Sequence, residues 1–434
     1  MGHDTTTSVS LIEAKAIRKT KVRILPLILL LYIIAFLDRI NIGFAAPTMN
    51  PELGITSHQF GLLAGIFFIG YFLVEIPSNL LLHRVGARVW LARILVTWGI
   101  VATLTAFVQS VNQLYLARFL LGLAEGGYFP GILLYLTYWF RQREQAEAIA
   151  FVLIGIPITS IVGAPMSGLI LDHVHWLGLG SWRWLLILEG LPAVACGVLA
   201  YYSLPSRPAE ARFLSREEKD WVVAQLALEE EEKRKTYSLS STRALMHGRV
   251  WHLACIAFTL GTVVFMMSFW LPQIVKTFSG RYSNTVVGLL VMIPNLIGLV
   301  FMIGISLSSD RKQERRWHTA IPAVAGAIAC FLFGTADSIL LSLALLSLFV
   351  AGVYGAMASF WALPSEFLTG FSAASGIALV TSLGSLGGFF GPYMVGFIQH
   401  RTGSLVGGMT FAGITLILLA TLVLLLPRRK APSV

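Results

Sequence analysis

The sequence predicts an all-α membrane protein with 12 transmembrane helices in two pseudo-symmetric six-helix bundles. Its composition is 56% hydrophobic and only 12% charged, and its mean hydropathy is +0.75. A soluble domain carries about twice that charged fraction, so lipid must be the solvent of this chain. Apolar runs of about 20 residues, the length that crosses a bilayer, recur twelve times. Residues 205–250 divide these runs six and six.

Each apolar run defines one expected span. In chain order the runs are 22–46, 58–82, 89–108, 113–138, 146–171, 182–204, 251–275, 286–308, 318–336, 338–364, 372–398 and 404–427. The polar segment between the sixth and seventh runs holds Pro205, Pro208 and the acidic run Glu229–Glu232, and we expect a solvated linker with one short amphipathic helix. The expected organisation is a cytoplasmic N-terminal tail (1–21), an N-terminal bundle (22–204), a cytoplasmic linker (205–250), a C-terminal bundle (251–427) and a cytoplasmic C-terminal tail (428–434).

The positions of lysine and arginine predict the orientation, because cytoplasmic loops carry an excess of both. Of the 32 Lys and Arg residues, 26 fall in segments that are cytoplasmic if the N-terminus is inside, and four fall outside. The net charge of +10 is therefore a topology signal and does not support nucleic-acid binding. We expect a multi-pass protein of the cell (inner or plasma) membrane with both termini in the cytoplasm. The remaining two cations, Arg39 and Arg118, lie inside spans.

A basic cytoplasmic turn occurs at the same place in each half. Arg84 and Arg88 follow the second span, and Asp310 and Arg311 follow the eighth. The correspondence indicates two parallel six-helix repeats, which would rock around a site near the midplane between them. We therefore assign these four residues to gating. The alternative is that any short cytoplasmic loop attracts arginine.

Charged residues inside spans are costly, by about 2.5–3.5 kcal/mol on insertion scales, and are usually functional and paired. Asp38 and Arg39 lie in the first span, and Arg118 and Glu125 lie in the fourth. Seven residues are nearly two helical turns, so Arg118 and Glu125 share a face. Asp38 and Arg39 are adjacent, so their side chains diverge by about 100°.

Two cations and two acids in a membrane interior suit the transport of an anion. Arginine offers a planar, bidentate donor for a carboxylate and keeps its proton, while a buried carboxyl group can carry a proton. The alternative is a set of salt bridges that only lock helices together, although well-packed apolar residues would generally serve stability as well. Of the other acids, we assign Glu75 to gating as a salt-bridge partner in preference to a substrate ligand. Glu189 lies within the sixth span without an obvious partner, and its role stays open.

Several classes of protein lack support in the sequence. No Walker-type Gly-Lys-Ser/Thr motif indicates ATP-driven transport. No His-Glu-x-x-His, Gly-x-Ser-x-Gly or paired intramembrane Asp indicates an intramembrane enzyme, and a 46-residue linker is too short for a signalling domain. The three cysteines fall in apolar stretches and indicate neither a disulfide framework nor a metal site. We expect no enzyme activity and no cofactor other than the proton as coupling ion.

Nearly the whole chain resembles the major facilitator superfamily, and within it the anion:cation symporter family, which includes permeases for tartrate, phthalate, hydroxyphenylacetate and galactonate. The branch that looks most similar is the bacterial tartrate and aromatic-acid branch. The motifs that carry the resemblance are Leu37-Asp38-Arg39-Ile40-Asn41-Ile42, Tyr71 with Glu75-Ile76-Pro77-Ser78-Asn79, Arg118 to Glu125 with Phe129-Pro130-Gly131, Tyr138-Trp139-Phe140, Phe269-Trp270-Leu271-Pro272-Gln273 and Gly384-Ser385-Leu386-Gly387-Gly388-Phe389-Phe390-Gly391-Pro392.

The resemblance implies a proton-coupled symporter of organic anions that works by alternating access. The roles it implies are proton coupling for Asp38 and Glu125, and substrate binding for Arg39, Tyr71, Arg118, Trp361, Thr381 and Ser385. The galactonate permease has Asn residues where this chain has Thr381 and Ser385, which makes a polyhydroxy sugar acid a poorer fit. His83 and Asn79 also depart from the superfamily pattern at the first cytoplasmic turn, whereas Asp310 keeps it in the second half.

We therefore expect uptake of a small organic anion, a hydroxy dicarboxylate such as tartrate or an aromatic carboxylate, by a functional monomer whose partners are that anion and the lipid bilayer. The main alternative is an organic-anion exporter or antiporter on the same fold. Paired arginines argue against cationic drugs as substrates, but nothing in the sequence excludes anion efflux.

Overall fold

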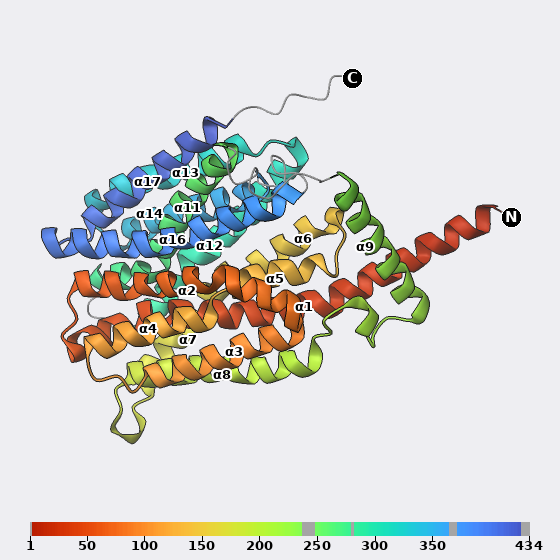
Figure 1. Ribbon diagram of the computed structural model, residues 1–434. Coiled ribbons are helices and arrows are strands. Elements are labelled where there is room, and N and C mark those ends of the chain that lie inside the picture. Colours follow the sequence, from red (N-terminus) through yellow and green to blue (C-terminus); the bar gives the residue numbers. More distant parts are fainter. Residues whose placement is uncertain (1, 237–247, 279–281, 364–370, 427–434) are drawn as a thin grey trace.

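The computed structural model describes residues 2–236, 248–278, 282–363 and 371–426 and shows long helices packed side by side (Figure 1). No β-strand occurs in these ranges. The helices are α1 (Gly2–Leu53), α2 (Ser57–Val85), α3 (Ala87–Thr105), α4 (Val111–Glu125), α5 (Tyr128–Thr137), α6 (Gln142–Leu153), α7 (Gly155–His173), η1 (Trp176–Gly178), α8 (Ser181–Ser203), η2 (Pro208–Glu210), α9 (Arg216–Thr236), α11 (Gly248–Phe278), α12 (Asn284–Lys312), α13 (Arg316–Leu332), η3 (Phe333–Thr335), α14 (Ile339–Phe360), α16 (Phe371–Thr402) and α17 (Val406–Leu424).

The predicted all-α membrane fold is confirmed. Eleven helical stretches of the described residues are long and apolar enough to cross a bilayer. The remaining predicted span, 372–398, is covered by α16, a single helix of 32 residues. The predicted tail 428–434 and part of the linker, 237–247, lie outside the described residues.

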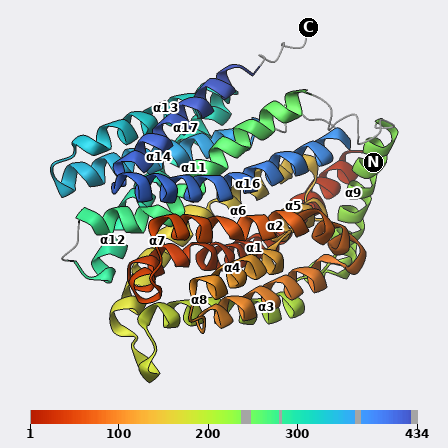
Figure 2. The same cartoon turned by 60° about the vertical axis from the view of Figure 1, so that its left-hand side comes forward.

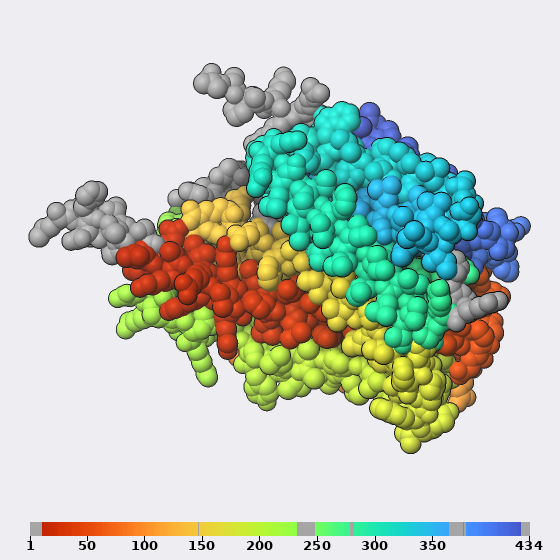
Figure 3. Space-filling view, turned by 180° about the vertical axis from the view of Figure 1, so that it is seen from behind, coloured from red at the N-terminus to blue at the C-terminus, as the bar shows by residue number. Residues whose placement is uncertain are grey.

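The helices form two groups that lie against each other. Helices α1 to α8 lie together in the lower part of Figure 1, and α11 to α17 lie above them. Across the border between the groups α2 packs on α16, α7 on α12 and α1 on α11, and the turned view keeps this arrangement (Figure 2). From behind, α7 in yellow runs beside α12 in blue-green (Figure 3). A site between the halves is therefore framed by these six helices.

The fourth predicted span is confirmed as one membrane-crossing stretch, Val111–Thr137, but it is divided into two helices. Helix α4 ends at Glu125 and α5 begins at Tyr128. Gly127 adopts φ +85°, in the left-handed region that favours glycine. A Cβ on Gly127 would lie 2.4 Å from Ser78 Oγ on α2, so glycine is required both by the turn and by the close approach. The break leaves Glu125 at the C-terminal end of a helix.

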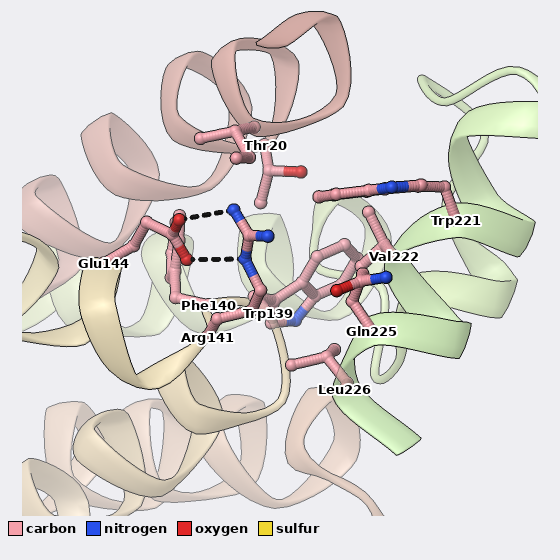
Figure 4. A pocket seen from close by; sticks show the side chains of 10 residues that line it. Thr20, Trp139, Phe140, Arg141, Glu144, Trp221, Val222, Gln225 and Leu226 are labelled. Atoms are coloured by element: carbon pink, nitrogen blue, oxygen red, sulfur yellow. Dashed lines mark hydrogen bonds and ion pairs between the residues drawn. The ribbon is translucent and has the colours of Figure 1, made fainter. Parts of the chain in front are cut away.

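The polar N-terminal residues, predicted as a cytoplasmic tail, are helical and form one 52-residue helix together with the first span. The linker helix α9, longer than expected, packs against the first part of α1. Lys19 Nζ lies 2.8 Å from the Glu218 carboxylate. Arg141, between α5 and α6, hydrogen-bonds Glu144 and lies against Trp221 of α9, 4.8 Å from the ring centroid (Figure 4). These contacts hold the linker across one end of the N-terminal group.

Candidate functional site

Asp38 lies on α1 in the middle of the N-terminal group and is 1% exposed. Trp98 of α3 donates its indole N–H to Oδ2 at 2.7 Å, and Asn41, one turn further along α1, donates to Oδ1 at 3.2 Å. No described cation forms an ion pair with Asp38. Hydrogen bonds from neutral donors therefore hold this carboxyl group, and its charge is not directly compensated.

Arg39 points away from Asp38 and forms a buried ion pair with Glu125 of α4. Its guanidinium is surrounded by aromatic rings and lies 5.3 Å from the ring centroids of both Phe67 and Tyr71. The expected divergence of the side chains of Asp38 and Arg39 is therefore observed. The sequence spacing placed Glu125 near Arg118, but the structure pairs it with the arginine of another helix.

Arg118 of α4 is 1% exposed, and its guanidinium lies 5.1 Å from the Phe67 ring centroid. Its Nε and Nη2 have no hydrogen-bond partner within the part of the chain that the structure describes. Asp38 and Glu125 both lie within electrostatic reach of it. A buried guanidinium with unused donors is costly unless an anion satisfies them. Arg118 therefore presents two donor nitrogens, with three N–H groups between them, that no described residue uses.

Tyr71 and Glu75 lie one turn apart on α2, and both are buried. The Tyr71 hydroxyl accepts the backbone N–H of Phe129, in the first turn of α5, at 3.2 Å. Thr381 of α16 donates to Glu75 Oε1 at 3.5 Å. Glu75 forms no ion pair with Arg84 or Arg88, so the salt bridge expected for gating is absent between these described residues. Glu75 instead joins the two groups of helices.

The other predicted substrate residues lie in the C-terminal group. Ser385 donates to the carbonyl oxygen of Thr381 at 3.1 Å, so the two hydroxyl residues stand one turn apart on α16. Trp361 follows the last turn of α14, and its ring centroid lies 6.4 Å from that of Phe129 of α5. Trp361 and Thr381 thus each contact a residue of the N-terminal group.

The predicted gating residues lie at the ends of their helices, away from this site. Arg84 is exposed in the last turn of α2, and Arg88 lies 5.3 Å from the Tyr201 ring centroid. Asp310 pairs with Arg315 at 2.5 Å, while Arg311 is exposed. The structure therefore places these four residues around two separate turns and does not bring them into one cluster.

The two groups of helices pack tightly against each other at the end away from α9. A Cβ on Gly61 of α2 would lie 2.7 Å from the Pro392 carbonyl oxygen, and one on Gly288 of α12 would lie 2.2 Å from that of Ala164. At the same end Asp172, the penultimate residue of α7, accepts hydrogen bonds from the first residues of α12. Asp172 was not predicted as a functional residue, because the sequence around it does not indicate that it binds a residue of the other half.

Sequence reasoning also missed the indole of Trp98 beside Asp38, whereas the i+3 spacing of Asn41 was a usable signal. Glu189, left without a role, is fully buried on α8, and Ser167 of α7 donates to its Oε1 at 2.7 Å. The N-terminal group therefore encloses a larger set of buried carboxyl groups than the two that were assigned to proton coupling.

Comparisons with known proteins agree with this fold. Residues 28–392 match the model of the Major Facilitator Superfamily. The chain is 42% identical over 423 residues, 98% of its length and 94% of the relative's, to a protein of Agrobacterium vitis named "Putative tartrate transporter". It is 38% identical over 405 residues, 93% of both chains, to the "Quinolone resistance transporter" of Acinetobacter baumannii. Among solved structures, a bacterial homologue of the human lysosomal transporter Spinster, in an inward-facing and occupied conformation, superposes with a TM-score of 0.74 at 14% identity, covering 93% of this chain and 96% of the other.

A multi-pass helical protein with this fold and with such relatives is a membrane transporter and not an enzyme. The chain belongs to the Major Facilitator Superfamily. The relatives also confirm the resemblance to the anion:cation symporter type of that superfamily, which the motifs around Asp38 and Arg118 indicated.

Proposed function

We propose that this protein is a proton-coupled symporter that takes up a small organic anion, either a hydroxy dicarboxylate such as tartrate or an aromatic carboxylate, by alternating access. The observation that carries the proposal is the buried guanidinium of Arg118, whose Nε and Nη2 have no partner among the described residues. Arginine binds a carboxylate through two parallel N–H bonds. The name of the Agrobacterium vitis relative supports tartrate as one substrate to test.

Proton coupling follows from the ion pair between Arg39 and Glu125. A proton on Glu125 neutralises the carboxylate and weakens its hold on Arg39. The freed guanidinium is then available to the second carboxylate of a dicarboxylate substrate. It is equally available to the ring of an aromatic substrate, because the aromatic rings of Phe67 and Tyr71 already lie beside it. Binding of a proton and binding of the anion therefore favour each other.

Asp38 supplies the second proton site. Arg118 lies within electrostatic reach of Asp38 and partly compensates its charge. When a substrate carboxylate takes over Arg118, Asp38 loses that compensation and favours a proton. Tyr71, Trp361, Thr381 and Ser385 then complete the binding site from both halves, and no cofactor takes part.

Alternating access requires that the halves separate at one end while they close at the other. The close contacts at Gly61, Gly288 and Asp172 make the end away from α9 the closed end here. With the basic turns in the cytoplasm, this is the outer end, and the site faces inward. We place both termini in the cytoplasm and the monomer in the inner membrane.

A second candidate is export of an organic anion on the same fold. The quinolone resistance transporter, at 38% identity, is the observation in its favour. Buried carboxylates and arginines serve either direction, because the direction depends on the gradients and on which side offers the substrate.

The deciding experiment is uptake of radiolabelled tartrate and benzoate into proteoliposomes under an imposed pH gradient. Symport is expected to accumulate one of these acids above the level in protein-free liposomes when the outside is acidic, and to lose this excess when a protonophore collapses the gradient. Accumulation that is driven only when the gradient is reversed would establish proton-driven antiport. Accumulation that is indifferent to the gradient would contradict coupling to protons.

A further inference from the structure

Phe68 is a buried aromatic residue of α2 that the proposed transport mechanism leaves unused. Its ring packs on α11, which belongs to the other group of helices. The ring centroids of Phe68 and Phe265 lie 4.4 Å apart, and Phe269, one turn further along α11, meets Phe68 edge to face at 6.3 Å. Phe68 is 1% exposed. Two aromatic side chains of the C-terminal group therefore form a wall against a ring of the N-terminal group.

Gly388 of α16 completes the space for this ring. A Cβ on Gly388 would lie 2.6–2.7 Å from three atoms of the Phe68 ring, closer than side chains in contact normally come. The ring fits here because residue 388 has no side chain. Gly384, one turn earlier on α16, is different, since a Cβ there would lie 3.5 Å from the Ala257 carbonyl oxygen, in ordinary contact. Gly388 and the two phenylalanines of α11 thus form a socket that Phe68 fills.

The position of Phe68 along α2 places it between the proposed binding site and the closed outer end. Gly65, three residues nearer that end, takes part in the close packing of α2 on α16. Tyr71, three residues further inwards, belongs to the proposed site. On α16, Ser385 of the same site lies three residues inwards from Gly388. Phe68 in its socket is therefore the innermost of the tight contacts that separate this site from the outside.

Arg39 borders this contact. Its Cζ lies 6.0 Å from the ring centroid of Phe68 and 5.9 Å from that of Phe265, so the guanidinium is next to one ring from each half. A guanidinium at this distance is attracted to an aromatic ring. An anion bound at Arg39 would therefore lie beside the two rings that separate it from the outer end.

From this geometry we infer that Phe68 is the plug of the outer gate: its ring, seated in the socket at Gly388, closes the binding site towards the outside in the inward-facing state. The inference rests on the alternating access of the proposed function, but it depends neither on proton coupling nor on the identity of the anion. When the halves separate at the outer end, the ring leaves the socket and opens the path to Arg39.

A methyl group at residue 388 tests the socket. In Gly388→Ala the ring cannot take its place without a shift, and such overpacking should raise the population that is open at the outer end by about fivefold or more. Pulsed electron resonance measures this population through spin labels at the exposed residues Leu177 and Leu340, in protein without native cysteines. Gly384→Ala is the matched control and should keep the parent distances. Adding Phe68→Ala to Gly388→Ala removes the clashing ring and should bring the distances back towards those of the parent.

Access to the site from outside tests the plug itself. Ser385→Cys, in the same background without native cysteines, is exposed to a membrane-impermeant methanethiosulfonate reagent in right-side-out membrane vesicles. The cysteine should react slowly while Phe68 is present and at least severalfold faster in Phe68→Ala, with Phe68→Leu in between because it keeps part of the apolar volume. Phe390→Ala makes the same change on the exposed face of α16 and should leave the rate unchanged.

Two results would overturn the inference. Parent-like distances in Gly388→Ala would show that the socket does not hold the ring, and parent-like protection of the cysteine in Phe68→Ala would show that other contacts close the outer end. Thermal unfolding in detergent checks that each variant is folded, and Phe68→Leu takes the place of Phe68→Ala if the latter is not. Failure of the proposed function is seen separately, as a lack of uptake driven by a pH gradient in proteoliposomes, which neither measurement requires.

Discussion

The carboxylate of Asp172 accepts two hydrogen bonds from Thr285, one from its backbone N–H and one from its hydroxyl, each at 2.7 Å. Asn284 adds its own backbone N–H at 3.0 Å and its side-chain amide at 2.9 Å. Asp172 lies in the last turn of α7 in the N-terminal group, while both donors begin α12 in the C-terminal group. A negative charge at the N-terminus of a helix is favourable, so this contact ties the halves together at one end.

Replacing Asp172 with Asn should loosen that contact. An amide presents one oxygen where the carboxylate presents two, and hydrogen bonds to a charged group contribute about 1.5–3 kcal/mol. The population that is open at this end should therefore rise by roughly tenfold or more. Spin labels at the exposed residues Leu177 and Leu340, after removal of the native cysteines, report the opening as a longer distance by pulsed electron resonance. Asp337→Asn, at an exposed site near the same end, is the control. Equal distances between the spin labels in the two variants would show that Asp172 does not hold this end closed.

Gly288 tests the same closure by steric means. A Cβ there would lie 2.2 Å from the backbone of Ala164, which cannot move aside as a side chain can. Gly288→Val should keep the outer ends apart and abolish transport, while the protein still folds and binds from outside. Gly304 lies on the same helix, and a Cβ there would meet no neighbouring atom within 4 Å, so Gly304→Val should transport normally. Measured transport by Gly288→Val at the parent rate would rule out close packing of α7 on α12 as part of the cycle.

Arg118 should be needed for its shape as well as its charge. Arg118→Ala is expected to abolish binding of the anion. Arg118→Lys should leave it weakened by roughly tenfold or more, because an ammonium lacks the planar fork of N–H donors. Isothermal titration with the accepted acid measures both. Arg88→Lys, far from the site, controls for the change of residue type, and parent-like affinity in Arg118→Lys would show that charge alone is enough.

Glu125→Gln should separate binding from coupling. Gln mimics the protonated acid and releases Arg39 from its ion pair, so binding of the anion is retained and becomes less dependent on pH. Uptake driven by a pH gradient should disappear, whereas counterflow exchange, which needs only the loaded carrier to reorient, should continue. Asp38→Asn is measured beside it as the second proposed proton carrier. Accumulation against a gradient by Glu125→Gln would leave Glu125 a structural partner of Arg39.

The linker contact gives a prediction on stability. Burial opposes ionisation of Glu218, but hydrogen bonds from Lys19 and Ser215 outweigh it and hold the pKa of Glu218 below its usual value. A lowered pKa contributes stability that is present above the ordinary value of about 4.3 and is lost as the pH falls through the folded value. Glu218→Gln should therefore destabilise the protein at neutral pH, by no more than about 1 kcal/mol because Lys19 is half exposed. Thermal unfolding should show the difference fading in acid, and Asp220→Asn on the same helix should show none.

The general architecture was predictable because lipid imposes a simple rule on sequence: about 20 apolar residues for each crossing. The ends of the helices were less predictable. Gly127, at the break between α4 and α5, lies against Ser78 of α2, and the N-terminal part of α1 contacts Glu218 of the linker through Lys19. Both contacts join segments far apart in the chain, and hydropathy does not record them.

For the buried charges, too, the sequence indicated which residues matter but not which of them pair. Their rarity inside spans was enough to single out Asp38, Arg39, Arg118 and Glu125. Their pairing was not predictable from spacing along one helix, because Glu125 meets Arg39 across two helices. Glu189 was visible in the sequence as an acid without a partner, and only the packing of α8 on α1 brings it near Asp38.

The break at Gly127 also affects the order of events in a transport cycle. Glu125 stands where α4 ends, at the negative pole of the helix dipole. Its charge is tolerable while Arg39 is beside it. If a substrate carboxylate draws Arg39 away first, the Glu125 carboxylate is left without its cation at the negative end of the helix dipole. In the proposed mechanism, reorientation of the loaded carrier would then be unfavourable until Glu125 takes up a proton. In the proposed mechanism, an unbroken helix would remove this penalty and let the carrier return loaded with the anion but without the proton, so the glycine turn would favour tight coupling.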